Sequence, residues 1–290
     1  MSVKLGPNRY GKAEIRLVRV VRDGPVDDAV HHVKDLNVST SLSGDMDAVH
    51  LTGDNAAVLP TDTQKNTAYA LAREHGVGQI EEFALLLARH FVESQPTVHH
   101  ARVEIDEYAW RREGPHSFVR EGGEVRTCAV HHDRDGRSTV VSGLKDLVLM
   151  NTTGSEFHGY IVDEYTTLQP TTDRILATAV AARWRHTGDT TAYGKSYEQV
   201  RGSLLDAFAG THSLSLQQTL YAMGERALTA CPEICEIRLS MPNKHHFPVD
   251  LSPFGLDNQN EVFFAADRPY GLIEGSVLRE DASDAGFAWE

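Results

Sequence analysis

The sequence has few cysteines, no long apolar run, and fewer basic than acidic side chains. Its three cysteines, Cys128, Cys231 and Cys235, cannot all pair within one chain, and so low a number is typical of a reducing compartment. No apolar run approaches bilayer-spanning length, and the first residues lack the apolar core of a signal peptide. With 41 acidic against 28 basic residues, the net charge of −13 disfavours duplex DNA and anionic membranes as partners. We therefore expect a cytoplasmic protein that binds neither nucleic acid nor membrane.

Motifs that would identify several reaction types are also missing. The chain has no Gly-x-Ser-x-Gly, which argues against a nucleophile-elbow hydrolase, and no His-Glu-x-x-His or paired Cys-x-x-Cys. Its 15 histidines do include adjacent pairs at 31–32, 99–100, 131–132 and 245–246. Neighbouring side chains of a strand point to opposite faces, so one such pair cannot readily hold one ion. We therefore expect no catalytic metal.

Alternating and helical patterns divide the chain into two similar halves. At 41% hydrophobic over 290 residues, the chain can form one large or two medium domains with a sizeable core. In the first half the patterns predict strands at 12–21, 36–42, 48–51, 98–110 and 117–132, and helices at 62–75 and 79–94. In the second half they predict strands at 139–150, 175–184, 235–241, 261–266 and 273–278, and helices at 197–208 and 216–229.

The two halves match residue by residue at one constant offset. Pro96 and Arg102, for example, correspond to Pro232 and Arg238, and the helices before the prolines match at the same offset. A tight polar turn at 133–137 is the best boundary between the halves. We therefore expect two tandem units and a tail, at 1–135, 136–280 and, as a disordered acidic segment, 281–290.

Each unit has the order strand-strand-helix-helix-strand-strand, which predicts an α+β fold with an antiparallel four-stranded sheet and both helices on one face. The other face and the edges of such sheets would stay uncovered, and long open edges invite aggregation. Closure into a barrel by a second copy of the chain would remove these edges. We therefore expect a homo-oligomer whose sheets join across subunits, with a site at the subunit interface.

Four stretches combine polar and aromatic residues in ways unlike ordinary core, namely 10–12, 59–67, 155–176 and 241–247. In the second of them, Pro60 stiffens a strand-to-helix junction at which Thr61, Asp62 or Thr63 could accept hydrogen bonds from free helix N–H groups. Taken singly, the notable side chains have ordinary structural roles: core for Phe157, an ion pair for Arg174, a helix cap for Gln217, solvent for Lys12, and strand hydrogen bonding for His245.

Together and in this order, the four stretches closely resemble the urate oxidase (uricase) family of the tunnelling-fold superfamily, from about residue 10 to residue 278. The resemblance implies that Lys12, in Tyr-Gly-Lys, pairs with a threonine hydroxyl. It implies that Thr61, in Thr-Asp-x-x-Lys-Asn-Thr, is that threonine, and that Asp62 follows it at the edge of the substrate. It further implies that Phe157 stacks on the purine and that Leu168 is an apolar position near the ring.

The resemblance also assigns residues from the later motifs. Arg174 and Gln217 correspond to the pair that grips the flat substrate, and Leu216 to a position near the ring. Asn243 and His245, in Pro-Asn-Lys-His, correspond to polar groups above the ring where oxygen or water sits. The family implies sites shared between two subunits of a homotetramer, urate and molecular oxygen as reactants, and no cofactor. The chain ends in Phe-Ala-Trp-Glu instead of the Ser-Lys-Leu-type peroxisomal signal of many eukaryotic members, which suits a cytoplasmic enzyme.

These residue types suit urate on physical grounds as well. A planar guanidinium such as that of Arg174 gives parallel charge-assisted bonds to the edge of a purine anion, which a lysine cannot. The amide of Gln217 offers one donor and one acceptor, and a phenyl face allows stacking without a competing charge. If a subunit interface desolvates its ammonium, Lys12 beside Thr61 can relay protons, helped by His245. The expected reaction is oxidation of urate by oxygen to 5-hydroxyisourate with release of hydrogen peroxide.

Two other functions fit parts of this pattern. A pterin- or guanine-nucleotide-processing relative would share the fold, but such enzymes often grip the ring with a glutamate and several use zinc, whereas this chain offers Gln217 and Arg174. A purine-binding module without turnover would be favoured if Lys12 and Thr61 proved remote from Arg174.

Overall fold

The structure, a computed structural model, describes residues 2–23 and 30–290 of the chain, so residues 1 and 24–29 of the expected first unit lie outside the described part. The contacts divide the chain into two compact units. Unit 1 comprises Met1–Gly143, Arg185–Gly194 and Ser283–Glu290, and unit 2 comprises Leu144–Trp184 and Lys195–Ala282. Among the described residues, no helix is both long and apolar enough to cross a membrane.

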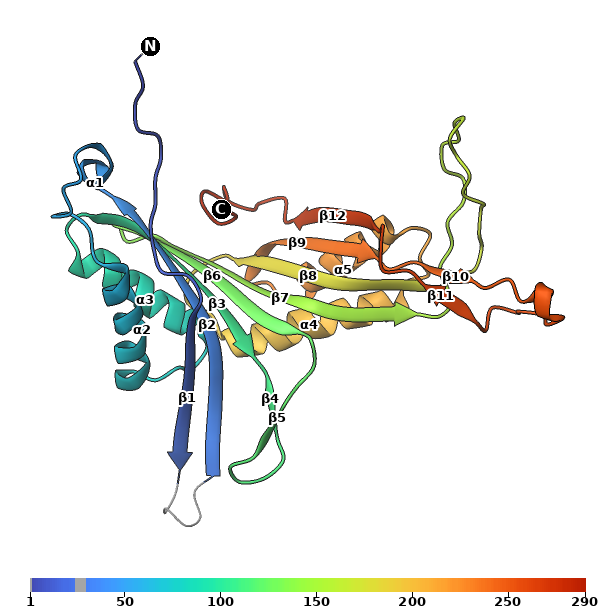
Figure 1. The fold of residues 1–290 in the computed structure, drawn as a ribbon, viewed down its shortest axis with the longest axis horizontal. Helices are drawn as coiled ribbons and strands as arrows, with labels where there is room; N and C mark the ends of the chain where they lie inside the picture. The colour runs from blue at the N-terminus through green and yellow to red at the C-terminus, as the bar shows by residue number, and fades with distance from the viewer. Residues whose placement is uncertain (1, 24–29) are drawn as a thin grey trace. The chain divides into compact units, whose positions relative to one another are not determined.

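Unit 1 is an antiparallel sheet with two long helices on one face (Figure 1). Its strands follow the hydrogen-bonded order β1-β2-β3-β6-β7, and a small β4-β5 hairpin stands apart. The strands are β1 (Ile15–Asp23), β2 (Val30–Gly44), β3 (Val98–Tyr108), β4 (Trp110–Arg112), β5 (Phe118–Arg120), β6 (Val125–Asp133) and the start of β7 (Ser138–Asn151), and the helices are α1 (Asp47–Leu51), α2 (Thr61–Glu74) and α3 (Ile80–Ser94).

The core of unit 1 lies between α3 and the strands it covers. Ala101, Val103 and Ile105 alternate along β3, are almost fully buried, and belong to the same cluster as Phe83 and Leu87 of α3. Side chains that repeat every two residues along the strand pack here against side chains that repeat every 3.6 residues along the helix. The strand predicted at 98–110 and the helix predicted at 79–94 therefore meet in the core of this unit.

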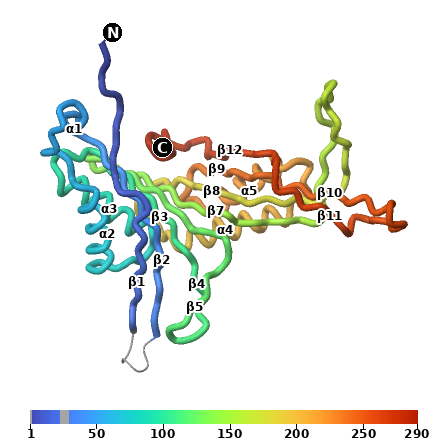
Figure 2. The backbone as a smooth tube through the Cα atoms, viewed as in Figure 1, coloured from blue at the N-terminus to red at the C-terminus, as the bar shows by residue number. Residues whose placement is uncertain are grey.

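Unit 2 repeats the same element order and joins its strands in the order β7-β8-β9-β12. Its elements are the rest of β7, β8 (Leu176–His186), α4 (Tyr193–Gly210), α5 (Leu216–Ala230), β9 (Ile234–Asn243), β10 (His246–Pro248), η1 (Ser252–Phe254), β11 (Phe263–Ala265) and β12 (Gly271–Leu278). The tube of Figure 2 shows the yellow-green loop between β7 and β8 standing away from these strands. That loop and the β10-β11 hairpin line the cavity of this unit described below.

The repeat predicted from the sequence is visible in the element boundaries. Ile80 and Leu216 each begin the second long helix of a unit, and Val98 and Ile234 each begin the strand that follows it. In α5, Gly224 lies so close to β12 that a Cβ atom there would come within 2.5 Å of a side-chain methyl of Val277. This close approach lets the helix pack directly on the sheet.

Two predicted strands differ in the structure. Residues 48–51, predicted as a strand, belong to the short helix α1. The predicted strand at 117–132 is instead two strands, β5 and β6, separated by a segment that contains Gly122 with a positive φ of 51°. In the first case the apolar run is too short to distinguish two periods, and in the second a glycine pair interrupts the ladder.

The end of the chain packs on unit 1, although its composition predicted a disordered acidic tail at 281–290. Ala288 is fully buried and clusters with Ala129 and Val141, and the ring of Phe287 lies 5.0 Å from that of His100. The three hydrophobic residues at 287–289 offer apolar surface that the acidic residues before them do not. Composition averaged over the tail conceals this apolar end.

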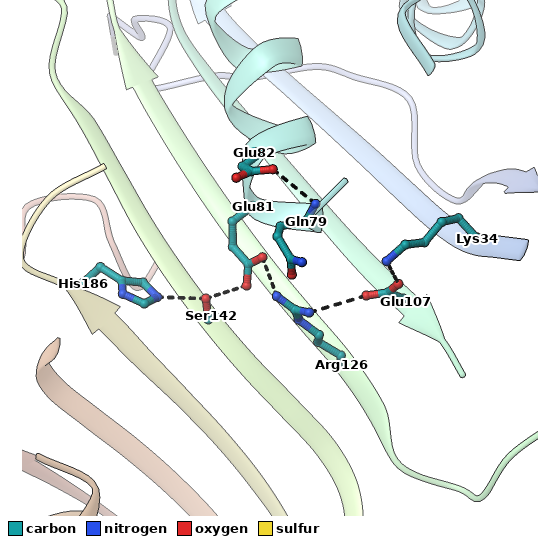
Figure 3. A network of polar contacts seen from close by, with 8 residues as sticks. All are labelled: Lys34, Gln79, Glu81, Glu82, Glu107, Arg126, Ser142 and His186. Atoms are coloured by element: carbon teal, nitrogen blue, oxygen red, sulfur yellow. Dashed lines mark hydrogen bonds and ion pairs between the residues drawn. The ribbon is translucent and has the colours of Figure 1, made fainter. Parts of the chain in front are cut away.

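A buried polar network crosses unit 1 from α3 to its strands (Figure 3). The fully buried Glu81 accepts a hydrogen bond from Arg126 Nη2 at 2.7 Å and one from Ser142 Oγ at 2.6 Å. Because Ser142 donates to Glu81, its oxygen accepts from His186 Nε2 at 2.9 Å. A second carboxylate, on Glu107, lies 3.8 Å from Arg126 Nη1. The buried carboxylate is thus compensated by a cation and by a hydroxyl donor.

Candidate active site

A cavity of about 670 Å³ opens in unit 2, large enough for a bicyclic ligand. It is lined from the β7–β8 loop, the start of α5, the end of β9 and the β10-β11 hairpin. Among its lining residues are all the candidates that the sequence placed in this half of the chain: Phe157, Leu168, Arg174, Leu216, Gln217, Asn243 and His245. The structure therefore gathers in one cavity residues that are up to about ninety positions apart in the sequence.

Phe157 and Arg174 are fixed together by the fold of the β7–β8 loop. Phe157 exchanges two backbone hydrogen bonds with Thr171, at 2.8 and 3.0 Å. Arg174 donates to Ser155 twice, from its backbone N–H to the carbonyl at 3.0 Å and from Nε to Oγ at 3.2 Å. The guanidinium is thereby held over the ring of Phe157, while burial lowers the pKa of Arg174 below its ordinary value. It remains a cation at neutral pH and offers its remaining N–H groups to a ligand.

Gln217 stands in the first turn of α5 without capping the helix. Ser215 is the N-cap and accepts from the backbone N–H of Gln218 at 3.2 Å, while the side chain of Gln218 accepts from Leu214 N at 2.9 Å. Leu216 is buried in the core and anchors the turn. The capping role that Gln217 could have taken is therefore filled by its neighbours, and its exposed amide lines the cavity.

The end of β9 brings Asn243 and His245 to the same cavity. Asn243 pairs with Gly271 of β12, and the backbone N–H of Lys244 donates to Ala177 O at 2.8 Å. Burial, then the positive charge of Arg174, then the neighbouring His246 lower the pKa of His245 from its ordinary value of 6.5. His245 is therefore a neutral imidazole at neutral pH, able to accept a proton.

Lys12 lies in unit 1, on a segment tied to the start of α2. The backbone N–H of Lys12 donates to Thr40 Oγ1 at 3.3 Å, and Thr40 Oγ1 in turn donates to the buried Gln64 Oε1 at 2.7 Å. Just before Lys12, the hydroxyl of Tyr10 donates to Leu59 O at 2.9 Å. Lys12 itself precedes β1, which begins at Ile15, although the sequence predicted a strand from residue 12.

Thr61 is the first residue of α2, and Asp62 follows it at the exposed end of the helix. Pro60 is the N-cap and no side chain caps this helix, so the predicted capping by Thr61, Asp62 or Thr63 is absent. Instead Asp62 accepts from Lys65 at 2.6 Å and from Asn66 at 3.0 Å. The pKa of Asp62 is lowered chiefly by Lys65, and further by Asn66 and the charge of Lys12. Asp62 is thus an ionised carboxylate within the field of Lys12.

The sequence patterns missed several residues of the cavity. Asn260, which has a positive φ of 60°, and Phe263 reach it from the β10-β11 hairpin, and Ile273 reaches it from β12. His246, the second histidine of its pair, also lines it. No functional motif marks Asn260 and Phe263, because a hairpin between two three-residue strands brings them to the cavity. In the described part of the chain, no group of three or more His, Cys, Asp or Glu side chains is arranged to hold a metal ion.

Comparison with known proteins decides the family. The model of the family described as Uricase matches residues 8–131 and 140–274. The chain belongs to the uricase family. It is 53% identical to the uricase of Arthrobacter globiformis over 281 residues, which cover 96% of this chain and 91% of that protein. It is 39% identical to the uricase of Dictyostelium discoideum over 280 residues, which cover 94% of this chain and 96% of that protein.

Solved structures agree with this membership. The crystal structure of the uricase from Arthrobacter globiformis superimposes with a TM-score of 0.95 at 50% identity, covering 100% of this chain and 99% of that one. The chain therefore has a mixed α+β uricase-like fold, as the sequence resemblance implied. Uricases are urate oxidases, so this uricase-family chain is an enzyme of the oxidoreductase class. The pterin-processing alternative is set aside by the same comparisons.

Proposed function

We propose that this chain oxidises urate with molecular oxygen to 5-hydroxyisourate and hydrogen peroxide. One observation carries the proposal. Arg174, held over the ring of Phe157, lines the same cavity as Gln217. A planar anion fits this combination of aromatic face, fixed cation and amide. Urate stacks on Phe157, its edge accepts hydrogen bonds from the guanidinium, and Gln217 matches the alternating donors and acceptors of the purine. Leu168 and Leu216 supply apolar contact beside the ring.

The proposed chemistry needs proton transfer and an electron-rich substrate. Urate gives up two electrons to oxygen, a peroxide adduct forms on the ring, and water replaces the peroxide, so that the new hydroxyl oxygen comes from water. Lys12 and the Thr61 hydroxyl relay protons, His245 accepts or returns one, and Asn243 binds the oxygen or water above the ring. Asp62 adds a carboxylate at the edge of the substrate. The proposal assigns no cofactor, because urate itself is the reductant.

We further propose that two tandem tunnelling-fold units per chain close into a barrel with a second copy, within a homotetramer. Exposed apolar side chains on the edge strands support this assembly. On β1, at the edge of the sheet of unit 1, Val18 is 60% and Val20 is 44% exposed. On β12, at the edge of the sheet of unit 2, Leu272 is 54% and Leu278 is 52% exposed. Pairing between copies would cover such edges.

In this assembly each site combines Lys12 and Thr61 of one subunit with Arg174 and Gln217 of another. Subunit mixing tests this arrangement. Lys12→Met and Arg174→Ala chains, carrying different tags, are co-expressed, and assemblies containing both are isolated. An interface shared by two-fold symmetry gives each mixed pair one intact and one doubly defective site, so random mixing restores about a quarter of wild-type activity.

The matched control mixes Lys12→Met with Thr61→Ala chains. Both defects then fall in the half-site that one subunit contributes, so no intact site forms and no activity returns. Equal recovery in the two mixtures, or none in the first, would contradict the shared site. The reaction itself predicts loss of urate absorbance in air without an added cofactor.

A further inference from the structure

Glu156, immediately before Phe157, accepts hydrogen bonds from two histidines that the proposed mechanism does not use. His212 Nε2 lies 2.6 Å from Glu156 Oε1, and His158 Nε2 lies 2.8 Å from Oε2. The bond to His212 and then that to His158 lower the pKa of Glu156 below its ordinary value of 4.5. The carboxylate is therefore ionised at neutral pH and can only accept, so both histidines donate from Nε2. Both are charge-assisted bonds.

The two histidines differ in what they connect. His158 belongs to the same loop as Glu156, so its bond closes a local contact across two residues. His212 belongs to the segment between α4 and α5, 56 residues away. Of these two side-chain bonds, only the one to His212 joins the β7–β8 loop to the segment before α5.

Backbone pairing accompanies this tie. Glu156 N donates to Ser213 O at 2.7 Å, and Ser213 N donates to Gly154 O at 2.9 Å. Ser155 and Ser213 form a parallel bridge, and both are buried. Ser213 Oγ also accepts from Thr219 of α5 at 2.8 Å. The side-chain bond between Glu156 and His212 thus lies at the exposed edge of this short, buried backbone ladder.

Both sides of this ladder carry residues of the cavity. On one side, Ser155 holds the guanidinium of Arg174, and Glu156 is followed by Phe157. On the other side, two residues separate the ladder at Ser213 from Leu216, and Gln217 follows. The pairing of these two segments therefore sets the distance between the ring of Phe157 and the amide of Gln217.

We propose that Glu156 is a positioning residue for substrate binding, which acts through His212 to fix Phe157 and Arg174 relative to Gln217. The inference rests on the proposed function of this cavity. The positioning role belongs to the bond between Glu156 and His212, which joins two loops. It does not belong to the bond between Glu156 and His158, which lies within one loop. Removing the carboxylate leaves the buried backbone ladder in place but removes the side-chain bond at its exposed edge. The distance between the ring of Phe157 and the amide of Gln217 is then no longer fixed, while the chain stays folded.

The test compares Glu156→Ala, His212→Ala and the double variant, with His158→Ala as the matched control. Each of the first two raises the KM for urate about tenfold, as the loss of one charge-assisted hydrogen bond predicts, with kcat changed less than about threefold. Because both substitutions remove the same bond, the double variant is no worse than either single one. His158→Ala changes KM by less than about twofold, since the bond between loops remains. Glu156→Gln restores most of the affinity, because its amide oxygen still accepts from His212.

A merely structural role predicts a different pattern, in which kcat and thermal stability fall together and His158→Ala resembles His212→Ala. That pattern, additive effects in the double variant, or an unchanged KM in Glu156→Ala would overturn the inference. Urate binding under nitrogen, followed by its absorbance shift, separates this result from the proposed function. Wild-type protein that binds urate without consuming it would refute the oxidation, while weaker binding by Glu156→Ala would still support the positioning role.

Discussion

The Cζ atom of Arg174 lies 5.2 Å from the centroid of the Phe157 ring, in a cation–π contact within the cavity of unit 2. The two residues are separated in the sequence by a loop whose ends are joined by the hydrogen bonds of Ser155 and Thr171. A flat anion entering the cavity therefore meets an aromatic side chain and a cation whose relative positions are already fixed. Such preorganisation reduces the entropy lost on binding.

Replacing Arg174 should mainly weaken urate binding. Arg174→Lys keeps the charge but loses the planar fork, so we expect a KM about 10- to 100-fold higher, and Arg174→Ala should raise it further. The kcat at saturating urate should change much less, because the lost contact is made in both ground and transition states. Steady-state kinetics checks this, with the exposed Arg226→Lys of α5 as a control that leaves KM unchanged. A large fall in kcat at unchanged KM would assign Arg174 a different role.

Lys12 and Thr61 should affect turnover instead of binding. Lys12→Met and Thr61→Ala each remove one member of the proposed proton relay, so we expect kcat to fall about 10²- to 10⁴-fold. Urate affinity measured under nitrogen should stay within about threefold of wild type. Lys4→Met, a change of the same kind at an exposed lysine, provides the comparison. Wild-type kcat in either relay variant would remove that residue from the mechanism.

His245 should give the pH profile an acidic limb that lies below pH 6.5. Burial, Arg174 and His246 all lower its pKa, so the imidazole stays neutral as pH falls through 6.5 and is protonated only at lower pH. The proton-accepting form, and with it kcat, is then lost through that lower range. As pH falls, His245 is protonated in the unfolded chain before it is protonated in the folded chain. The free energy of unfolding therefore also declines as pH falls below 6.5.

Two variants identify that limb. His246→Gln removes one cause of the shift and should move the limb towards 6.5. His245→Asn should abolish it, with a low kcat that no longer depends on pH in this range. The measurement is kcat at saturating urate between about pH 5 and 8. A limb that persists in His245→Asn belongs to another group.

The buried network around Glu81 should matter for stability. Glu81→Ala removes the carboxylate nearest to the partly buried Arg126, so we expect the free energy of unfolding to fall by about 3–5 kcal/mol. Ser142→Ala removes one hydrogen bond to the remaining carboxylate and should cost about 1–3 kcal/mol. Denaturant unfolding at a fixed protein concentration measures both, because self-association also stabilises the fold. Glu93→Ala, at an exposed position of the same helix, should change little; a cost equal to that of Glu81→Ala would contradict the role of burial.

Elements with a long, regular pattern were predictable from the sequence. α3 and α5 present apolar residues at helical spacing over 15 residues each, and their ends match the predicted ranges within two residues. The repeat was readable because both halves keep the same spacing from helix to strand. By contrast, the short helix α1 and the end of the chain at Phe287 to Trp289 depend on tertiary contacts that a local pattern does not encode.

The candidate site divides in the same way. The motifs that contain Phe157, Arg174 and His245 together resemble a family, so the sequence alone could predict these residues as a group. Asn260 reaches the cavity only because β10 pairs with β11, and Glu156 meets His212 only because the two loops fold together. Contacts between distant loops need the fold before they can be seen.

The most direct test of the account follows urate, oxygen and hydrogen peroxide simultaneously in air, using protein treated with a chelator and then freed of it. We predict that each urate lost is matched by about one oxygen consumed and one peroxide released, with no added metal or cofactor. Arg174→Ala, at urate concentrations below the wild-type KM, should show little of any of the three changes. Binding of urate without oxygen uptake, or turnover that returns only when a metal is added back, would contradict it.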